Sequence, residues 1–69
     1  MKTTIIVEGL KCHHCEMHVE EALKKIPGVN EAKANKDLKE VVIDSDNTIE
    51  EAVIEKAVKE AGYTFKGIR

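Results

Sequence analysis

Two stretches of this sequence carry apolar residues at helical spacing, and this feature constrains the fold more than any other. The first stripe, at i, i+3, i+4 and i+7, consists of Val19, Ala22, Leu23 and Ile26. The second has the same spacing and consists of Ile54, Ala57, Val58 and Ala61. Each stripe predicts an amphipathic helix with a single apolar side. Another element must cover that side, so the rest of the chain has to supply it.

The ends of both helices have sequence signals. Pro27 and Gly28 stop the first helix. Thr48, followed by Glu51, predicts a capping box at the start of the second helix, and Gly62 predicts its C-terminal cap. Acidic residues come early in the first helix and lysines come late, as the helix dipole prefers: Glu16, Glu20 and Glu21, then Lys24 and Lys25.

Four short runs between and around these helices predict strands. They read TTIIVE, VNEAKAN, EVVIDS and YTFKGI, of which the second is weak because Asn, Glu, Lys and Ala are poor strand formers. The element order is therefore β-α-β-β-α-β. We expect residues 1–69 to form one α+β domain of the ferredoxin-like βαββαβ type, a four-stranded antiparallel sheet with two helices on one face.

Charge and hydropathy exclude several classes of protein. The chain has 13 acidic and 11 basic residues, interleaved without a basic stripe or an aromatic platform, which argues against a nucleic-acid partner. The beginning, MKTTIIVEGL, lacks the apolar core of a signal peptide, and no segment is long enough to insert into a membrane. We expect a cytoplasmic protein. No acid–base or nucleophile–base arrangement indicates an enzyme.

Both cysteines and all three histidines lie within GLKCHHCEMH, residues 9–18. Two cysteines so close in sequence cannot form a disulfide framework. Cys15 precedes Val19 by four residues and continues the apolar stripe, so we expect it to be partly buried in the first helical turn. Cys12 should lie in the preceding loop and be more exposed. A helix N-terminus favours thiolates, and a thiolate pair suits Cu(I) and other thiophilic ions.

A C-x-x-C pair can also bind structural zinc, attach a c-type haem, act as a redox pair or pack in the core. Structural zinc normally takes four ligands, and only one cysteine pair exists. A c-type haem would need histidine directly after the second cysteine, where the chain has Glu16. A thioredoxin-like redox pair is the serious rival, although the only proline, Pro27, follows the first helix as a stop signal would. Buried structural cysteines are poorly placed beside two polar histidines.

The segments GLKCHHC, IPGV and AGY together resemble the heavy-metal-associated domain family, and within it the small bacterial copper chaperones. The resemblance implies a ferredoxin-like fold and one metal ion bound by Cys12 and Cys15, with Cu(I) preferred. It also implies delivery to a copper-transporting P-type ATPase, through its metal-binding domains, or to a copper-responsive repressor. Because the family also handles mercury, zinc and cadmium, Hg(II), Zn(II) and Cd(II) are alternative ions. Leu10 replaces the usual methionine and can pack under the loop in its place.

The remaining residues of this region have two interpretations each. His13 and His14 are either solvated loop residues or auxiliary metal ligands. Tyr63 either packs at the end of the second helix or, as the resemblance implies, covers the metal. For His18 and Met17 we expect surface or packing roles rather than ligation. We expect an independent protein rather than a piece of an ATPase, monomeric without metal, with a metal-bridged dimer as the alternative once loaded.

Ligand chemistry and the family resemblance together predict how such a protein works. Two thiolates hold Cu(I) in a near-linear site that stays open on one side. A thiolate of the partner adds before either original ligand leaves, so the ion passes through a shared three-coordinate state. The more exposed Cys12 is expected to meet the partner first.

Overall fold

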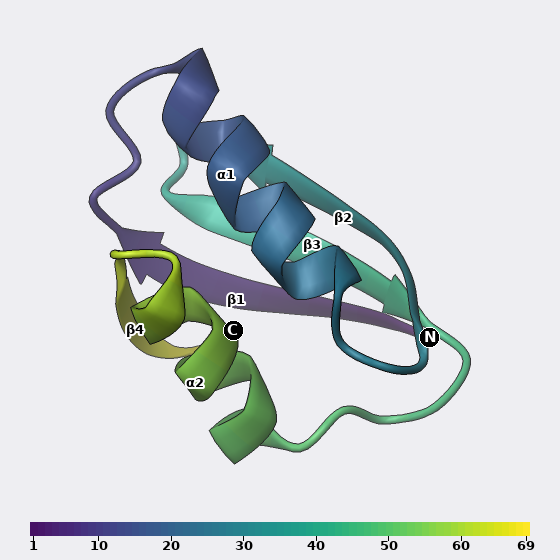
Figure 1. Cartoon of the computed structure of the whole chain (residues 1–69). Helices are drawn as coiled ribbons and strands as arrows, with labels where there is room; N and C mark the ends of the chain where they lie inside the picture. Colours follow the sequence, from purple (N-terminus) through teal and green to yellow (C-terminus); the bar gives the residue numbers. More distant parts are fainter.

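The computed structural model describes residues 1–69 and has the predicted element order (Figure 1). The elements are β1 (Lys2–Glu8), α1 (His13–Lys24), β2 (Val29–Asn35), β3 (Glu40–Ser45), α2 (Glu51–Glu60) and β4 (Thr64–Ile68). The strands form one sheet in the order β2-β3-β1-β4, and all three neighbouring pairs are antiparallel. Figure 1 shows both helices on the same side of this sheet. The predicted α+β ferredoxin-like fold is confirmed.

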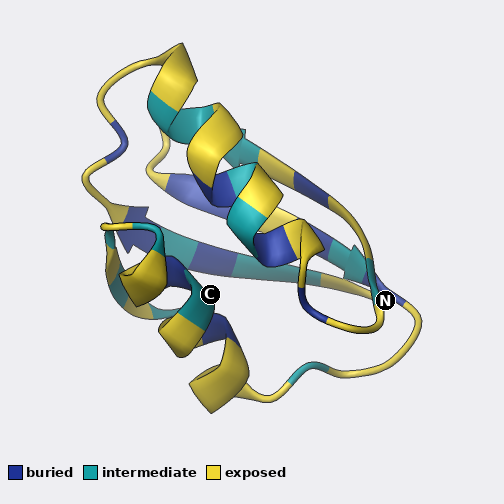
Figure 2. Ribbon diagram, viewed as in Figure 1, coloured by how far each residue is buried: buried dark blue, intermediate teal, exposed yellow.

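A single aliphatic core lies between the sheet and the helices (Figure 2). Alternate side chains of a strand point to the same face, so Ile5 and Val7 of β1 both enter the core, and Ile5 lies opposite Val41 of β3. The two helical stripes cover them, and their fully buried members are Val19, Leu23, Ile54 and Val58. The periodicity that predicted the helices therefore identified the side chains that close the core.

The end of α2 has a complete Schellman cap centred on Gly62. The Gly62 N–H donates to the Lys59 carbonyl at 3.0 Å, and the Tyr63 N–H donates to the Val58 carbonyl at 3.1 Å. Gly62 has φ of +95°, a conformation that glycine adopts without steric cost. The predicted cap is confirmed. After it the chain turns towards the loop that follows β1, and Tyr63 is the first residue to contact that loop.

The predicted capping box at the start of α2 is wrong. The N-cap residue is Glu50, with φ −63° and ψ 140°, and no side chain caps the helix. Thr48 donates its hydroxyl to the Met1 sulfur at 3.2 Å instead. The reason is that Ile49 packs against the core, and the extended backbone at Glu50 delays the first turn of the helix until Glu51.

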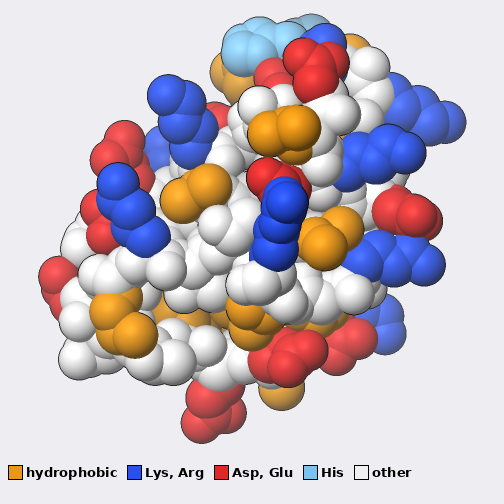
Figure 3. All heavy atoms as spheres, turned by 180° about the vertical axis from the view of Figure 1, so that it is seen from behind, with side chains coloured by type: hydrophobic (Ala, Val, Ile, Leu, Met, Phe, Trp, Pro, Cys, Tyr) orange, Lys and Arg blue, Asp and Glu red, His pale blue; other side chains and the backbone are white.

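The other face of the sheet has no helix over it. Figure 3, seen from behind, shows apolar side chains on this side scattered among charged ones. Val42, which alternates with the core residues Val41 and Ile43, is among the exposed apolar residues. Neither helix has the length and apolar character needed to cross a membrane.

Candidate metal centre

The two cysteines lie where the loop after β1 enters α1, at the same end of the molecule as Tyr63. Cys12 is the N-cap residue of α1, with extended backbone angles of φ −152° and ψ 174°. Its carbonyl accepts the Glu16 N–H at 3.2 Å, which closes the first turn of the helix. Cys15 is within that turn. The start of the helix therefore folds the loop back and brings two thiols that are three positions apart onto the same side.

The sulfur atoms of Cys12 and Cys15 are 3.5 Å apart. Both are free thiols; Cys12 is exposed and Cys15 is of intermediate exposure. This difference confirms the exposures predicted from the helical stripe. Because Cys15 also packs against the core, it is the better anchored of the two, whereas Cys12 is accessible from solvent.

The surroundings of Cys15 favour its ionised form. A hydrogen bond from the Lys11 backbone, then one from the Tyr63 hydroxyl and one from the Cys12 thiol, lower the pKa of Cys15 from 9.0 to about 7. The same contact acts oppositely on Tyr63, because a hydroxyl that donates to a thiolate resists losing its proton. The hydrogen bond to Cys15, followed by burial, raises the pKa of Tyr63 to about 12. Cys15 therefore ionises more readily near neutral pH than an ordinary cysteine does.

Tyr63 and Leu10 pack between the core and the loop that carries Cys12. Gly9 has φ of +103°, and a Cβ atom built there would lie 3.1 Å from Cδ1 of Tyr63. The tyrosine ring therefore packs directly against the loop backbone, and a side chain at Gly9 would have to displace it. Leu10 is 6% exposed and belongs to the core cluster. These contacts fix the base of the loop while leaving Cys12 at the surface.

The histidines do not converge on the sulfurs. The ring of His13 is 79% exposed, and its Nδ1 lies 3.0 Å from Oε1 of Glu16. His14 and His18 are exposed as well. No group of three or more His, Cys, Asp or Glu side chains is arranged to hold a metal ion. An auxiliary ligand role for His13 or His14 therefore stays a prediction.

Sequence reasoning assigned Glu16 and Glu20 to the helix dipole and missed their contacts with the sheet. The Lys36 N–H donates to Glu16 Oε2 at 2.7 Å, and the Ala34 N–H donates to Glu20 Oε2 at 2.8 Å. The Lys36 backbone, followed by the His13 ring, holds the pKa of Glu16 below its usual range. The only signal in the sequence is the i, i+4 spacing of the two acids, which does not reveal what they contact.

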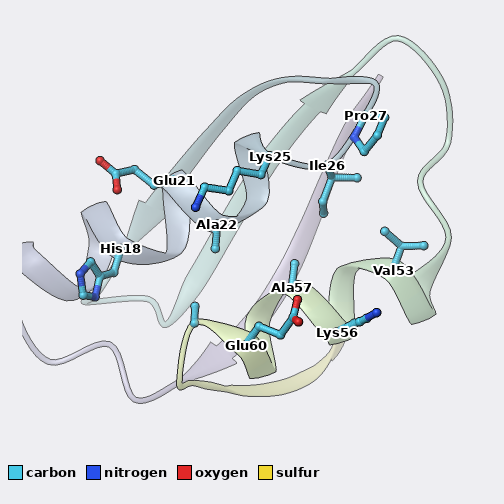
Figure 4. Close-up of a pocket in the computed structure, with 11 residues that line it drawn as sticks. His18, Glu21, Ala22, Lys25, Ile26, Pro27, Val53, Lys56, Ala57 and Glu60 are labelled. Atoms are coloured by element: carbon cyan, nitrogen blue, oxygen red, sulfur yellow. The ribbon is translucent and has the colours of Figure 1, made fainter.

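A separate groove of about 580 Å³ runs between the two helices (Figure 4). His18 and Glu21 of α1 and Lys25 at its C-cap line one side of the groove, and Lys56 and Glu60 of α2 line the other. Neither cysteine lines this groove. The thiol pair is therefore separate from this groove, with Cys12 exposed at the surface.

Sequence and fold both match known proteins. The profile of the heavy-metal-associated domain matches residues 4–64. The Copper chaperone CopZ of Staphylococcus haemolyticus (strain JCSC1435) is 38% identical over 63 residues, covering 90% of this chain and 93% of that protein. Copper-transporting ATPase 1 of Rhizobium meliloti (strain 1021) is 37% identical over 60 residues, covering 87% of this chain but 7% of that protein. The structure titled "CopZ metallochaperone" has a TM-score of 0.88 at 30% identity, covering 96% of this chain and 100% of that one.

Proposed function

This chain belongs to the heavy-metal-associated domain family, and we propose that it is a metallochaperone that carries one Cu(I) ion between Cys12 and Cys15. The observation that carries the proposal is the pair of free sulfur atoms 3.5 Å apart. One sulfur is anchored and the other is accessible, and no third ligand accompanies them. We place the protein in the cytoplasm, where such thiols stay reduced.

The spacing of the sulfurs fits one ion with little rearrangement. With metal–sulfur bonds of about 2.3 Å, two ligands on opposite sides of an ion are about 4.6 Å apart. The two sulfurs at 3.5 Å would have to separate by roughly 1 Å to reach that linear limit, and a bent geometry needs less. Cys12 is exposed and can supply the movement by rotating about its side-chain bonds, while Cys15 stays in place.

The proposed transfer proceeds by ligand exchange at this open pair. A partner thiolate adds to the ion from the solvent side, giving a three-coordinate intermediate, and the bond to Cys12 breaks first because Cys12 is the less anchored ligand. The bond to Cys15 breaks last, as the second thiolate of the partner takes its place on the ion. The Tyr63 hydroxyl then donates to the Cys15 thiolate that is left, so that departure of the ion does not require a proton from water.

We propose a copper-transporting P-type ATPase as the recipient, through a metal-binding domain of this same fold. The support is that a short segment of such an ATPase is similar to 87% of this chain. Donor and acceptor would then present equivalent thiol pairs, so the ion can move without a large change in its coordination energy. A copper-responsive repressor remains the second possible recipient.

A thiol–disulfide exchange protein is the second candidate function, favoured by one observation. The pKa of Cys15, lowered to about 7, is the kind of value found in C-x-x-C redox proteins. The two functions make different demands, since a redox protein reduces disulfides without any metal. We expect this chain to show no turnover with a protein disulfide substrate and a thiol reductant, whereas turnover would favour the redox function.

The main test is an anaerobic competition between the protein and a Cu(I) chelator. Replacing Cys12 or Cys15 with serine should weaken Cu(I) binding by several orders of magnitude, because a neutral hydroxyl replaces a soft thiolate. Native mass spectrometry of the same samples should show one ion per monomer. Parallel titrations with Zn(II), Cd(II) and Hg(II) establish the preference, and zinc should bind more weakly because two sulfurs leave its tetrahedral shell incomplete.

The matched control is Met17→Leu, which removes another sulfur-bearing side chain five positions after Cys12 without removing a thiolate. Met17 is 43% exposed, so this change should leave both fold and affinity unaltered. Wild-type affinity in both cysteine variants would refute the site, and sulfur-only spectra of bound Cu(I) would exclude His13 and His14 as ligands.

A further inference from the structure

The strand β2 lies at an edge of the sheet, because it pairs with β3 alone. Along such an edge, alternate backbone N–H groups point away from the neighbouring strand and need another acceptor. The N–H groups of Ala34, within β2, and of Lys36, just beyond it, donate to carboxylates of α1. The helix that carries the metal loop is thus tied to this edge through side chains, in addition to its apolar packing.

Glu16 connects this edge to the metal loop. It follows Cys15 directly in sequence, and its own N–H donates to the Cys12 carbonyl at 3.2 Å. One carboxylate oxygen accepts the Lys36 N–H, and the other lies 3.0 Å from the His13 ring. A single residue therefore contacts the strand edge, the N-cap residue and His13, one of the two residues between the cysteines.

The helix dipole alone does not account for these contacts. Glu20 lies in the second turn of α1, beyond the region where the dipole acts strongly, yet it binds Ala34 at 2.8 Å. The distances of both carboxylates to the strand are those of charge-assisted hydrogen bonds. Glu21 is on the same helix and is exposed, on the side of the groove between the helices. The two bonded acids are distinguished from it by their position over β2.

We propose that Glu16 and Glu20 are positioning residues for the metal site, which hold the first two turns of α1 on the edge of β2 and so keep Cys15 beside Cys12. A loop that is already ordered loses less conformational entropy when it binds an ion, and its affinity is higher for that reason. The hydrogen bonds of Glu16 and Glu20 to the N–H groups of Lys36 and Ala34 are present in the structure without a metal ion. Only the effect on affinity rests on the proposed function.

The test compares three variants with the wild type. In Glu16→Ala/Glu20→Ala the acceptors are lost, in Glu16→Gln/Glu20→Gln an amide oxygen can still accept each N–H, and Glu21→Ala is the control on the same helix. We expect Cu(I) affinity to fall about 10-fold in the alanine variant, as for other groups that orient metal ligands. The glutamine variant should lose less affinity than the alanine variant, because its amide oxygens still accept both N–H groups although the bonds are no longer charge-assisted. Glu21→Ala should not change affinity.

Amide hydrogen exchange of the metal-free protein gives a readout independent of copper. The amides of Ala34 and Lys36 should exchange slowly in the wild type and the glutamine variant, and faster in the alanine variant. Fast exchange of both amides in the wild type overturns the inference, even if the alanine variant does not fold. Undiminished affinity of a folded alanine variant, or equal loss in the glutamine variant, overturns it too. Failure of the wild type to bind Cu(I) instead refutes the proposed function and leaves the exchange test intact.

Discussion

The hydroxyl of Tyr63 is the one side-chain group from outside the loop that lowers the pKa of Cys15. In Tyr63→Phe the ring can keep its place against Gly9, but the hydrogen bond to Cys15 is lost. We expect the pKa of Cys15 to rise from about 7 towards its ordinary value of 9.0. The measurement is the pH dependence of iodoacetamide alkylation in the metal-free protein, with the modified cysteine identified by mass spectrometry.

The lowered pKa of Cys15 also makes the folding stability of the protein depend on pH. The pKa of Cys15 in the folded protein is lower than in the unfolded chain, so ionisation of Cys15 stabilises the fold. That contribution is fully present above about pH 9 and is lost as the pH falls through about 7. The wild type should therefore lose more stability over this range than Tyr63→Phe. Identical Cys15 titration curves in the two proteins would show that the hydroxyl has no such role.

Gly62 and Gly9, which lie at the ends of elements, are constrained in two ways: by backbone conformation at both, and also by a neighbouring side chain at Gly9. Gly62 and Gly9 both have positive φ, but a Cβ at Gly62 meets nothing within 4 Å, whereas one at Gly9 lies 3.1 Å from the Tyr63 ring. Gly62→Ala should cost about 1–2 kcal/mol from backbone strain alone. Gly9→Ala should cost more, because the ring must also move. Urea denaturation of both variants checks the order, and an equal or smaller loss for Gly9→Ala would contradict it.

The helices were predictable from the sequence because their apolar stripes and the glycine cap are strong local patterns. The stripes ending in Ile26 and Ala61 identified the buried sides of both helices, and Gly62 identified the end of the second. The capping-box motif failed because Ile49 packs against the core and Glu50, with an extended backbone, takes the N-cap position in place of Thr48. The contact of Glu16 with Lys36 was not predictable, since it joins residues that only the sheet topology brings together. The family resemblance placed Tyr63 near the metal loop, but no residue pattern revealed that its ring packs on Gly9.

At the scale of the whole molecule, the metal loop and the core depend on one another. A chain of 69 residues has a small core, here eleven buried apolar side chains in one cluster, and Leu10 within the loop is a member of it. Cys15 packs against the same cluster. An ion held between Cys12 and Cys15 should therefore stabilise the entire domain, because the loop that binds it cannot keep its geometry when the core unfolds.

This coupling predicts a large effect of the cargo on thermal stability. Free Cu(I) buffered at 100 times its dissociation constant adds about 2.7 kcal/mol when only the folded state binds. For a domain of this size, that corresponds to a rise in Tm of roughly 10–20 °C. Anaerobic calorimetry should show the rise in the wild type and in Met17→Leu, and its absence in Cys12→Ser/Cys15→Ser. An equal rise in the double serine variant would mean that copper stabilises the protein through another site, because the variant retains all three histidines but no thiol.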